Sequence, residues 1–123
     1  MQHSEGFLKL VADARARIRE LTVAEARARL AANGEAQLID VREDREWQQG
    51  HAAGALHMGR GIIERDIERR FPDHDRELIL YCGGGYRSAL TADNLQKMGY
   101  TNVYSMDGGW KAWQQSGAPT EVG

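Results

Sequence analysis

Apolar residues recur every three or four positions in several stretches of the chain, which places them on one face of a helix. Residues 5–20 have this pattern and predict an N-terminal helix. Thr22 followed by Glu25 is the capping-box pattern of a helix start and predicts a second helix over 23–32. Further helices are predicted at 62–71, 88–98 and 110–115, with one or two helical turns inside 42–49.

Four other apolar runs are short and have the character of buried strands. They cover residues 36–41, 55–58, 78–81 and 102–106. Strands and helices therefore alternate, which favours an α/β fold with a parallel sheet and helices on both faces. In such folds, sites form beyond the carboxyl ends of the strands. With 123 residues and no repeat or linker, the chain is expected to form one domain.

Composition and charge narrow the classes of partner. Apolar residues make up 41% and charged residues 28%, as in ordinary globular domains. The net charge is −2, whereas proteins that bind nucleic acid usually carry an excess of positive charge. We therefore expect no nucleic-acid partner. No window is long and apolar enough to span a bilayer, so no membrane partner is expected either. A lone cysteine fits a reducing compartment, which predicts a cytoplasmic protein, and the scattered histidines predict no metal.

The loop after the apolar run 78–81 carries the strongest chemical signal. It reads Cys82, Gly83, Gly84, Gly85, Tyr86 and Arg87, and a predicted helix follows from about Ser88. Three glycines let the backbone turn tightly and aim its amides inward, while the helix start adds a positive dipole end. This environment is expected to stabilise a thiolate, so Cys82 is a candidate nucleophile. A thiolate that attacks a sulfane sulfur forms a persulfide, which implies a ping-pong reaction.

Several segments in a fixed order resemble the rhodanese homology domain family. The loop matches its C-x-x-G-x-R pattern, and residues 38–42, the segment from Glu46 to Ala55 and residues 107–110 match other family motifs. The resemblance covers about residues 21–119 and leaves 1–20 as a helical extension. It implies a five-stranded parallel sheet, the fifth strand lying near 18–21, and no cofactor. It also implies sulfur transfer from thiosulfate or a persulfide to a thiol, cyanide or a sulfur-accepting protein.

The predicted site has Cys82 as its catalytic residue. The candidate substrate-binding residues are Gly83, Gly84, Gly85, Tyr86, Arg87, Ser88 and Arg60. Many family members have a basic residue where this chain has Gly83, so Arg60 and Arg87 are the expected substitutes. Asp40 and Arg42 follow a predicted strand, and we interpret them as a hydrogen-bonded loop brace that does not itself react.

Other hypotheses remain open at this point. Cys82 in a buried apolar setting would be inert. Cysteine phosphatases and arsenate reductases use a C-x-x-x-x-x-R loop, whereas only four residues separate Cys82 from Arg87 here. The smaller ring of amides suits a sulfur atom better than a tetrahedral phosphate. A non-enzymatic binding or signalling module on the same fold is the third alternative. The donor, the acceptor and the oligomeric state are not specified by the sequence.

Overall fold

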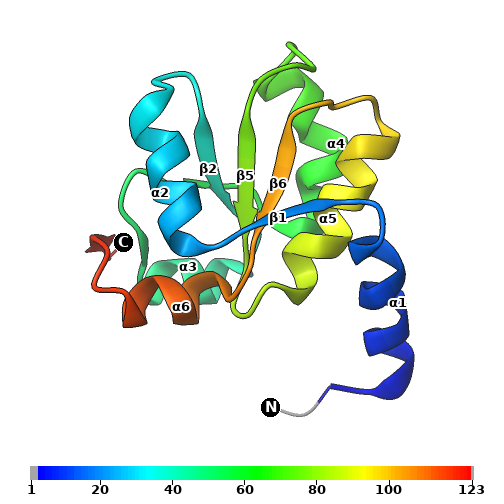
Figure 1. The fold of residues 1–123 in the computed structure, drawn as a ribbon, viewed down its shortest axis with the longest axis horizontal. Helices are drawn as coiled ribbons and strands as arrows, with labels where there is room; N and C mark the ends of the chain where they lie inside the picture. The colour runs from blue at the N-terminus through cyan, green and yellow to red at the C-terminus, as the bar shows by residue number, and fades with distance from the viewer. Residues whose placement is uncertain (1–2, 123) are drawn as a thin grey trace.

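The computed structural model describes residues 3–122, and its ribbon is shown in Figure 1. Residues 1 and 2 of the predicted extension lie outside the described part. The helices are α1 (Glu5–Arg15), α2 (Val23–Ala32), α3 (Asp44–Gln49), α4 (Arg60–Arg70), α5 (Tyr86–Lys97) and α6 (Gly109–Gln115). The strands are β1 (Arg19–Leu21), β2 (Gln37–Asp40), β3 (His51–Ala52), β4 (Leu56–His57), β5 (Leu78–Tyr81), β6 (Val103–Met106) and β7 (Thr120–Glu121).

Five strands form one parallel sheet in the order β1-β6-β5-β2-β4. This confirms the predicted α/β fold with its five-stranded parallel sheet. The N-terminal helix ends at Arg15, five residues earlier than predicted, because Arg19–Leu21 pair with β6 as the fifth strand. A two-residue antiparallel ladder between β3 and β7 was not predicted, since runs that short carry no periodic signal.

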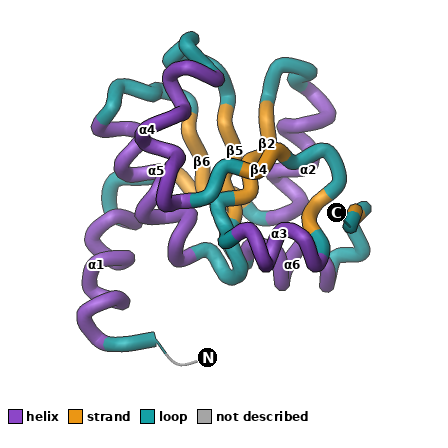
Figure 2. The backbone as a smooth tube through the Cα atoms, turned by 180° about the vertical axis from the view of Figure 1, so that it is seen from behind, coloured by secondary structure: helices purple, strands orange, loops and turns teal. Residues whose placement is uncertain are grey.

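Helices cover both faces of the sheet because its central strand is apolar on both sides. In β5, Leu78 and Leu80 pack with residues of α4 and α5, whereas Ile79 and Tyr81 pack with residues of α2 and α6. Figure 1 shows these two layers on opposite sides of the strands. The extension is a third layer, since α1 packs on the outer side of α5 (Figure 2).

Local capping signals explain where the helices begin. At α2 the Thr22 hydroxyl accepts a hydrogen bond from the Glu25 amide at 3.1 Å, and the Glu25 carboxylate accepts one from the Thr22 amide at 2.8 Å. The predicted capping box is therefore present. At α5 the helix begins directly after Gly85, so the Cys82 loop lies between the central strand and a helix N-terminus. Within residues 3–122, no helix has the length and apolar character that crossing a membrane requires.

Candidate active site

Cys82 is the residue that follows β5, and it is only 1% exposed. Its Sγ accepts hydrogen bonds from the amide of Gly85 at 3.2 Å and from the amide of Ser88 at 3.4 Å. Gly85 has a φ of +98°, a left-handed conformation that glycine adopts without steric cost. Among the described residues, the amides of Gly85 and Ser88 reach the sulfur, and the amides of Gly83 and Gly84 do not.

Two buried hydroxyl groups, those of Ser88 and Ser105, lie next to the Cys82 thiol. Ser88 Oγ is 3.6 Å from Cys82 Sγ and 2.8 Å from Ser105 Oγ. A hydroxyl group both donates and accepts, so Ser88 can accept from a thiol or donate to a thiolate. Sequence reasoning missed Ser105. The available signal was a small polar residue inside the apolar strand that ends at residue 106.

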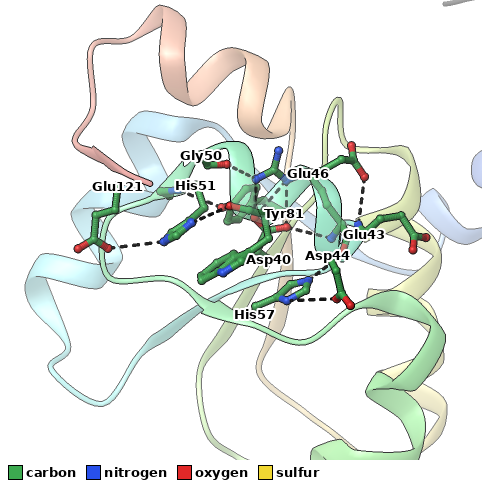
Figure 3. Close-up of polar contacts among 12 residues, drawn as sticks. Asp40, Glu43, Asp44, Glu46, Gly50, His51, His57, Tyr81 and Glu121 are labelled. Atoms are coloured by element: carbon green, nitrogen blue, oxygen red, sulfur yellow. Dashed lines mark hydrogen bonds and ion pairs between the residues drawn. The ribbon is translucent and has the colours of Figure 1, made fainter. Parts of the chain in front are cut away.

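Arg87 is paired with a carboxylate from α3. Its two terminal nitrogens lie 2.8 and 3.1 Å from the two oxygens of Glu46. Glu46 also accepts a hydrogen bond from the Glu43 amide at 3.0 Å, as Figure 3 shows. The Arg87 hydrogen bonds lower the pKa of Glu46 from 4.5 to about 2, and the same contact raises the pKa of Arg87. The charge of Arg87 is therefore largely balanced before any substrate arrives.

A cavity of about 680 Å³ lies beside Cys82. Three segments line it: the start of α1, the start of α3 and the Cys82 loop. The lining residues are His3, Ser4, Phe7, Glu43, Arg45, Glu46, Cys82, Gly84, Tyr86 and Arg87. This volume lies within the usual range for small-molecule sites.

The structure brings some of the predicted substrate-binding residues to this cavity and leaves others outside it. Gly84, Tyr86 and Arg87 line it. Arg60 lines a separate hollow with acidic Asp13 and Asp93, so the structure does not bring it to the cavity beside Cys82, and its role as an anion contact stays a prediction. Arg60 is the first residue of α4, and its amide donates to the Val41 carbonyl, next to the end of β2, at 3.0 Å. The second arginine of the cavity is Arg45, which sequence reasoning missed because α3 has no motif that marks it.

Asp40 and Arg42 form a buried brace at the carboxyl end of β2. Their side chains pair at 2.8 Å, and Arg42 also donates to the Gly50 carbonyl at 2.7 Å. Figure 3 shows Asp40 and Gly50 within this network. The Arg42 guanidinium lies over the Trp110 ring, 4.9 Å from its centroid. Neither Asp40 nor Arg42 lines the cavity, so their contacts position α3 and the start of α6 around it.

The start of α6 holds the backbone of the Cys82 loop from the other side. The amide of Trp110 donates to the Cys82 carbonyl at 2.7 Å, and the amide of Lys111 donates to the Gly83 carbonyl at 3.1 Å. Gly109 has a φ of +51°, and a Cβ there would overlap the Cys82 carbonyl. Gly109 is thus a positioning residue; in the sequence it was included in the family segment 107–110 but was given no role in the site.

The comparison with protein families gives a match that covers most of the chain. A model described as "Rhodanese-like domain" matches residues 22–116. The chain belongs to the rhodanese-like domain family. The matched region includes β5, the Cys82 loop and α5.

Solved structures agree with this family. A Rhodopseudomonas palustris protein of unknown function, described as a possible tyrosine phosphatase, is 31% identical with a TM-score of 0.86, and the match covers 98% of each chain. The polysulfide-sulfur transferase homodimer of Wolinella succinogenes is 27% identical with a TM-score of 0.82, covering 96% of this chain and 88% of the other. An Escherichia coli rhodanese with anions is 28% identical with a TM-score of 0.63, covering 72% and 99%.

The geometry of this rhodanese-like site defines the chemistry that it can support. The Cys82 sulfur accepts hydrogen bonds from two backbone amides and lies against a hydroxyl group, while the same residue lines a cavity large enough for a small molecule. Fixed amides stabilise negative charge without the cost of reorienting solvent. They can therefore hold a thiolate before attack and a negatively charged sulfur after it.

Proposed function

We propose that this rhodanese-like protein is a sulfurtransferase that carries a sulfane sulfur on Cys82 as a persulfide. The donor is thiosulfate or a persulfide, and the acceptor is a thiol, cyanide or a sulfur-accepting protein. One observation carries the proposal: Cys82 Sγ accepts two backbone amides while its residue lines a cavity. An inert core cysteine would have no need of either feature.

The proposed reaction has two displacements at sulfur. The Cys82 thiolate attacks the outer sulfur of thiosulfate, a bond forms between Sγ and that sulfur, and the S–S bond breaks to release sulfite with its electron pair. Cyanide or a thiolate then attacks the outer sulfur of the Cys82 persulfide. That step breaks the S–S bond of the Cys82 persulfide and regenerates the Cys82 thiolate. The Gly85 and Ser88 amides supply hydrogen bonds at the start and the end of the cycle.

Family context supports this activity and suggests how the chain is divided. The Wolinella protein, which is described as a polysulfide-sulfur transferase, matches 96% of this chain. We assign catalysis to residues 21–119 and treat 1–20 as an extension that adds to the site. A single reduced thiol is needed in each cycle, which fits the cytoplasm.

Phosphoryl transfer is the second candidate, because the Rhodopseudomonas protein is described as a possible tyrosine phosphatase. The loop length weighs against it in this chain. Four residues separate Cys82 from Arg87, and the guanidinium of Arg87 is held by Glu46. A phosphate dianion would have to compete with that carboxylate for the same charge.

Steady-state kinetics separates these candidates. The reduced protein is assayed with thiosulfate and cyanide, with glutathione persulfide and a thiol, and with p-nitrophenyl phosphate. We expect sulfur transfer with parallel double-reciprocal lines, no activity in Cys82→Ser, and no phosphate release. Phosphate release that depends on Cys82, without sulfur transfer, would show a phosphatase. Inactivity in all three assays would favour a binding module.

A further inference from the structure

The N-terminal helix contributes one wall of the cavity beside Cys82. His3, Ser4 and Phe7 line it, although all three lie outside the region that matches the family model. Figures 1 and 2 both place the start of α1 on the same side of the molecule as α3 and α6. Buried Val11 and Ala14 fix the helix against α5. The wall therefore belongs to a helix that packs on the rest of the domain.

This wall is aromatic. The His3 ring centroid lies 4.4 Å from that of Tyr86 and 5.2 Å from that of Phe7, and the Phe7 and Tyr86 centroids are 6.3 Å apart. Phe7 and Tyr86 are half-buried, so each keeps part of its ring open to the cavity. Aromatic surface of this kind gains free energy when carbon groups cover it, and a purely inorganic anion offers none.

The charges of the cavity do not favour a small dianion. Its lining contains two carboxylates, Glu43 and Glu46, and two guanidinium groups, Arg45 and Arg87, so these four charges cancel. Glu46 accepts one hydrogen bond from each terminal nitrogen of Arg87, and Gly83 adds no cation to the loop. Within residues 3–122, none of the ion pairs involves Arg45. One exposed guanidinium thus remains for a single carboxylate of a bound molecule.

We propose that the donor site is built for an organic persulfide with a carboxylate, and that α1 supplies the subsite for its carbon chain. This inference rests on the proposed sulfurtransferase function. The chain packs on Phe7, His3 and Tyr86, its carboxylate faces Arg45, and its outer sulfur meets Cys82. The thiolate attacks that sulfur, the donor S–S bond breaks, and the donor leaves as a thiolate. The outer sulfur keeps its proton, so Cys82 becomes the persulfide.

Phe7→Ala tests the aromatic subsite, and Leu8→Ala is its matched control. Leu8 lies on the same helix, is 42% exposed and does not line the cavity. The readout is the ratio of kcat/KM for glutathione persulfide to kcat/KM for thiosulfate. We expect Phe7→Ala to lower this ratio roughly tenfold, because the carbon chain loses its apolar surface. Leu8→Ala should leave the ratio unchanged.

Arg45→Gln tests the carboxylate contact with a second readout that does not depend on α1. We expect the KM for glutathione persulfide to rise about threefold, as for a solvent-exposed charge pair. The KM for the persulfide of 2-aminoethanethiol, which has no carboxylate, should stay constant.

Two results would overturn the inference: a donor ratio that Phe7→Ala leaves unchanged, or an Arg45→Gln variant in which the KM values of the two persulfides rise by the same factor. Failure of the proposed function looks different, because no donor would then add sulfur to Cys82 in the native protein.

Discussion

At the scale of single residues, the site separates the group that reacts from the groups that shape its surroundings. Cys82 Sγ is held by the amides of Gly85 and Ser88 and faces a hydroxyl group. Arg87, the residue that the loop pattern marks as an anion contact, is instead paired with Glu46. Its present contacts are those of a positioning residue that ties the Cys82 loop to α3.

The Glu46–Arg87 pair gives a prediction about pH. The pKa of Glu46 is about 2 in the folded protein and near 4.5 when the chain is unfolded. A carboxylate with a lowered pKa stabilises the fold fully above pH 4.5 and loses this effect as the pH falls toward 2. Glu46→Gln should lower the free energy of unfolding by less than about 1 kcal/mol at pH 7, because the side chains of Glu46 and Arg87 are both partly exposed to solvent.

Urea unfolding of the native protein and Glu46→Gln at pH 7 and pH 3 measures this difference. We expect the gap between the two free energies of unfolding to be smaller at pH 3. A gap that stays constant over this interval would mean that the ion pair does not stabilise the fold.

At the scale of elements, the Cys82 loop is fixed from two sides by helix starts. The N-terminus of α5 approaches the sulfur, while the N-terminus of α6 holds the loop carbonyls through the amides of Trp110 and Lys111. Gly109 makes this second approach possible, because any side chain there would meet the Cys82 carbonyl. The position of the nucleophile thus depends on an element more than twenty residues further along the chain.

Gly109→Ala should destabilise the fold and slow the loading of Cys82 with sulfur. The matched control is Gly117→Ala, where φ is +75° and a Cβ would meet no atom within 4 Å. Gly117→Ala should cost about 1–2 kcal/mol from backbone strain alone. Gly109→Ala should lower the free energy of unfolding in urea by clearly more than Gly117→Ala does, since its Cβ also overlaps with the Cys82 loop. Equal costs would show that the approach of α6 does not constrain Cys82.

Elements set by local chemistry could be predicted from the sequence, and those set by packing could not. The Thr22 capping box located α2 to the residue, and apolar runs located β2, β5 and β6 closely. The end of α1 was misplaced because Arg19–Leu21 form a strand only by pairing with β6. Arg60 was assigned to the site, and Arg45 and Phe7 were not, because their distances from Cys82 depend on how separate elements pack.

At the scale of the whole molecule, a buried ion pair links the sheet to the elements around the cavity. Asp40 ends β2, Arg42 reaches the Gly50 carbonyl that follows α3, and its guanidinium lies over Trp110 in α6. Asp40 is fully buried and Arg42 is 3% exposed, so neither charge has solvent to replace its partner. The Asp40–Arg42 pair therefore helps to fix the positions of β2, α3 and α6 relative to one another.

Asp40→Asn should destabilise the protein by about 3–5 kcal/mol, because it leaves the Arg42 guanidinium buried without a counter-charge. Asp66→Asn is the control, since Asp66 pairs with Arg65, whose side chain is 72% exposed. That variant should leave the urea midpoint nearly unchanged. A small effect at Asp40 would show that the brace tolerates loss of its charge.

The central claim is that Cys82 carries sulfur between two substrates, and intact mass spectrometry tests it most directly. The reduced protein is incubated with thiosulfate or glutathione persulfide, then chased with a thiol, beside Cys82→Ser. We expect the native chain to gain the mass of one sulfur atom and to lose it on the chase, while Cys82→Ser gains nothing. No gain with either donor, or an equal gain in Cys82→Ser, would contradict the account.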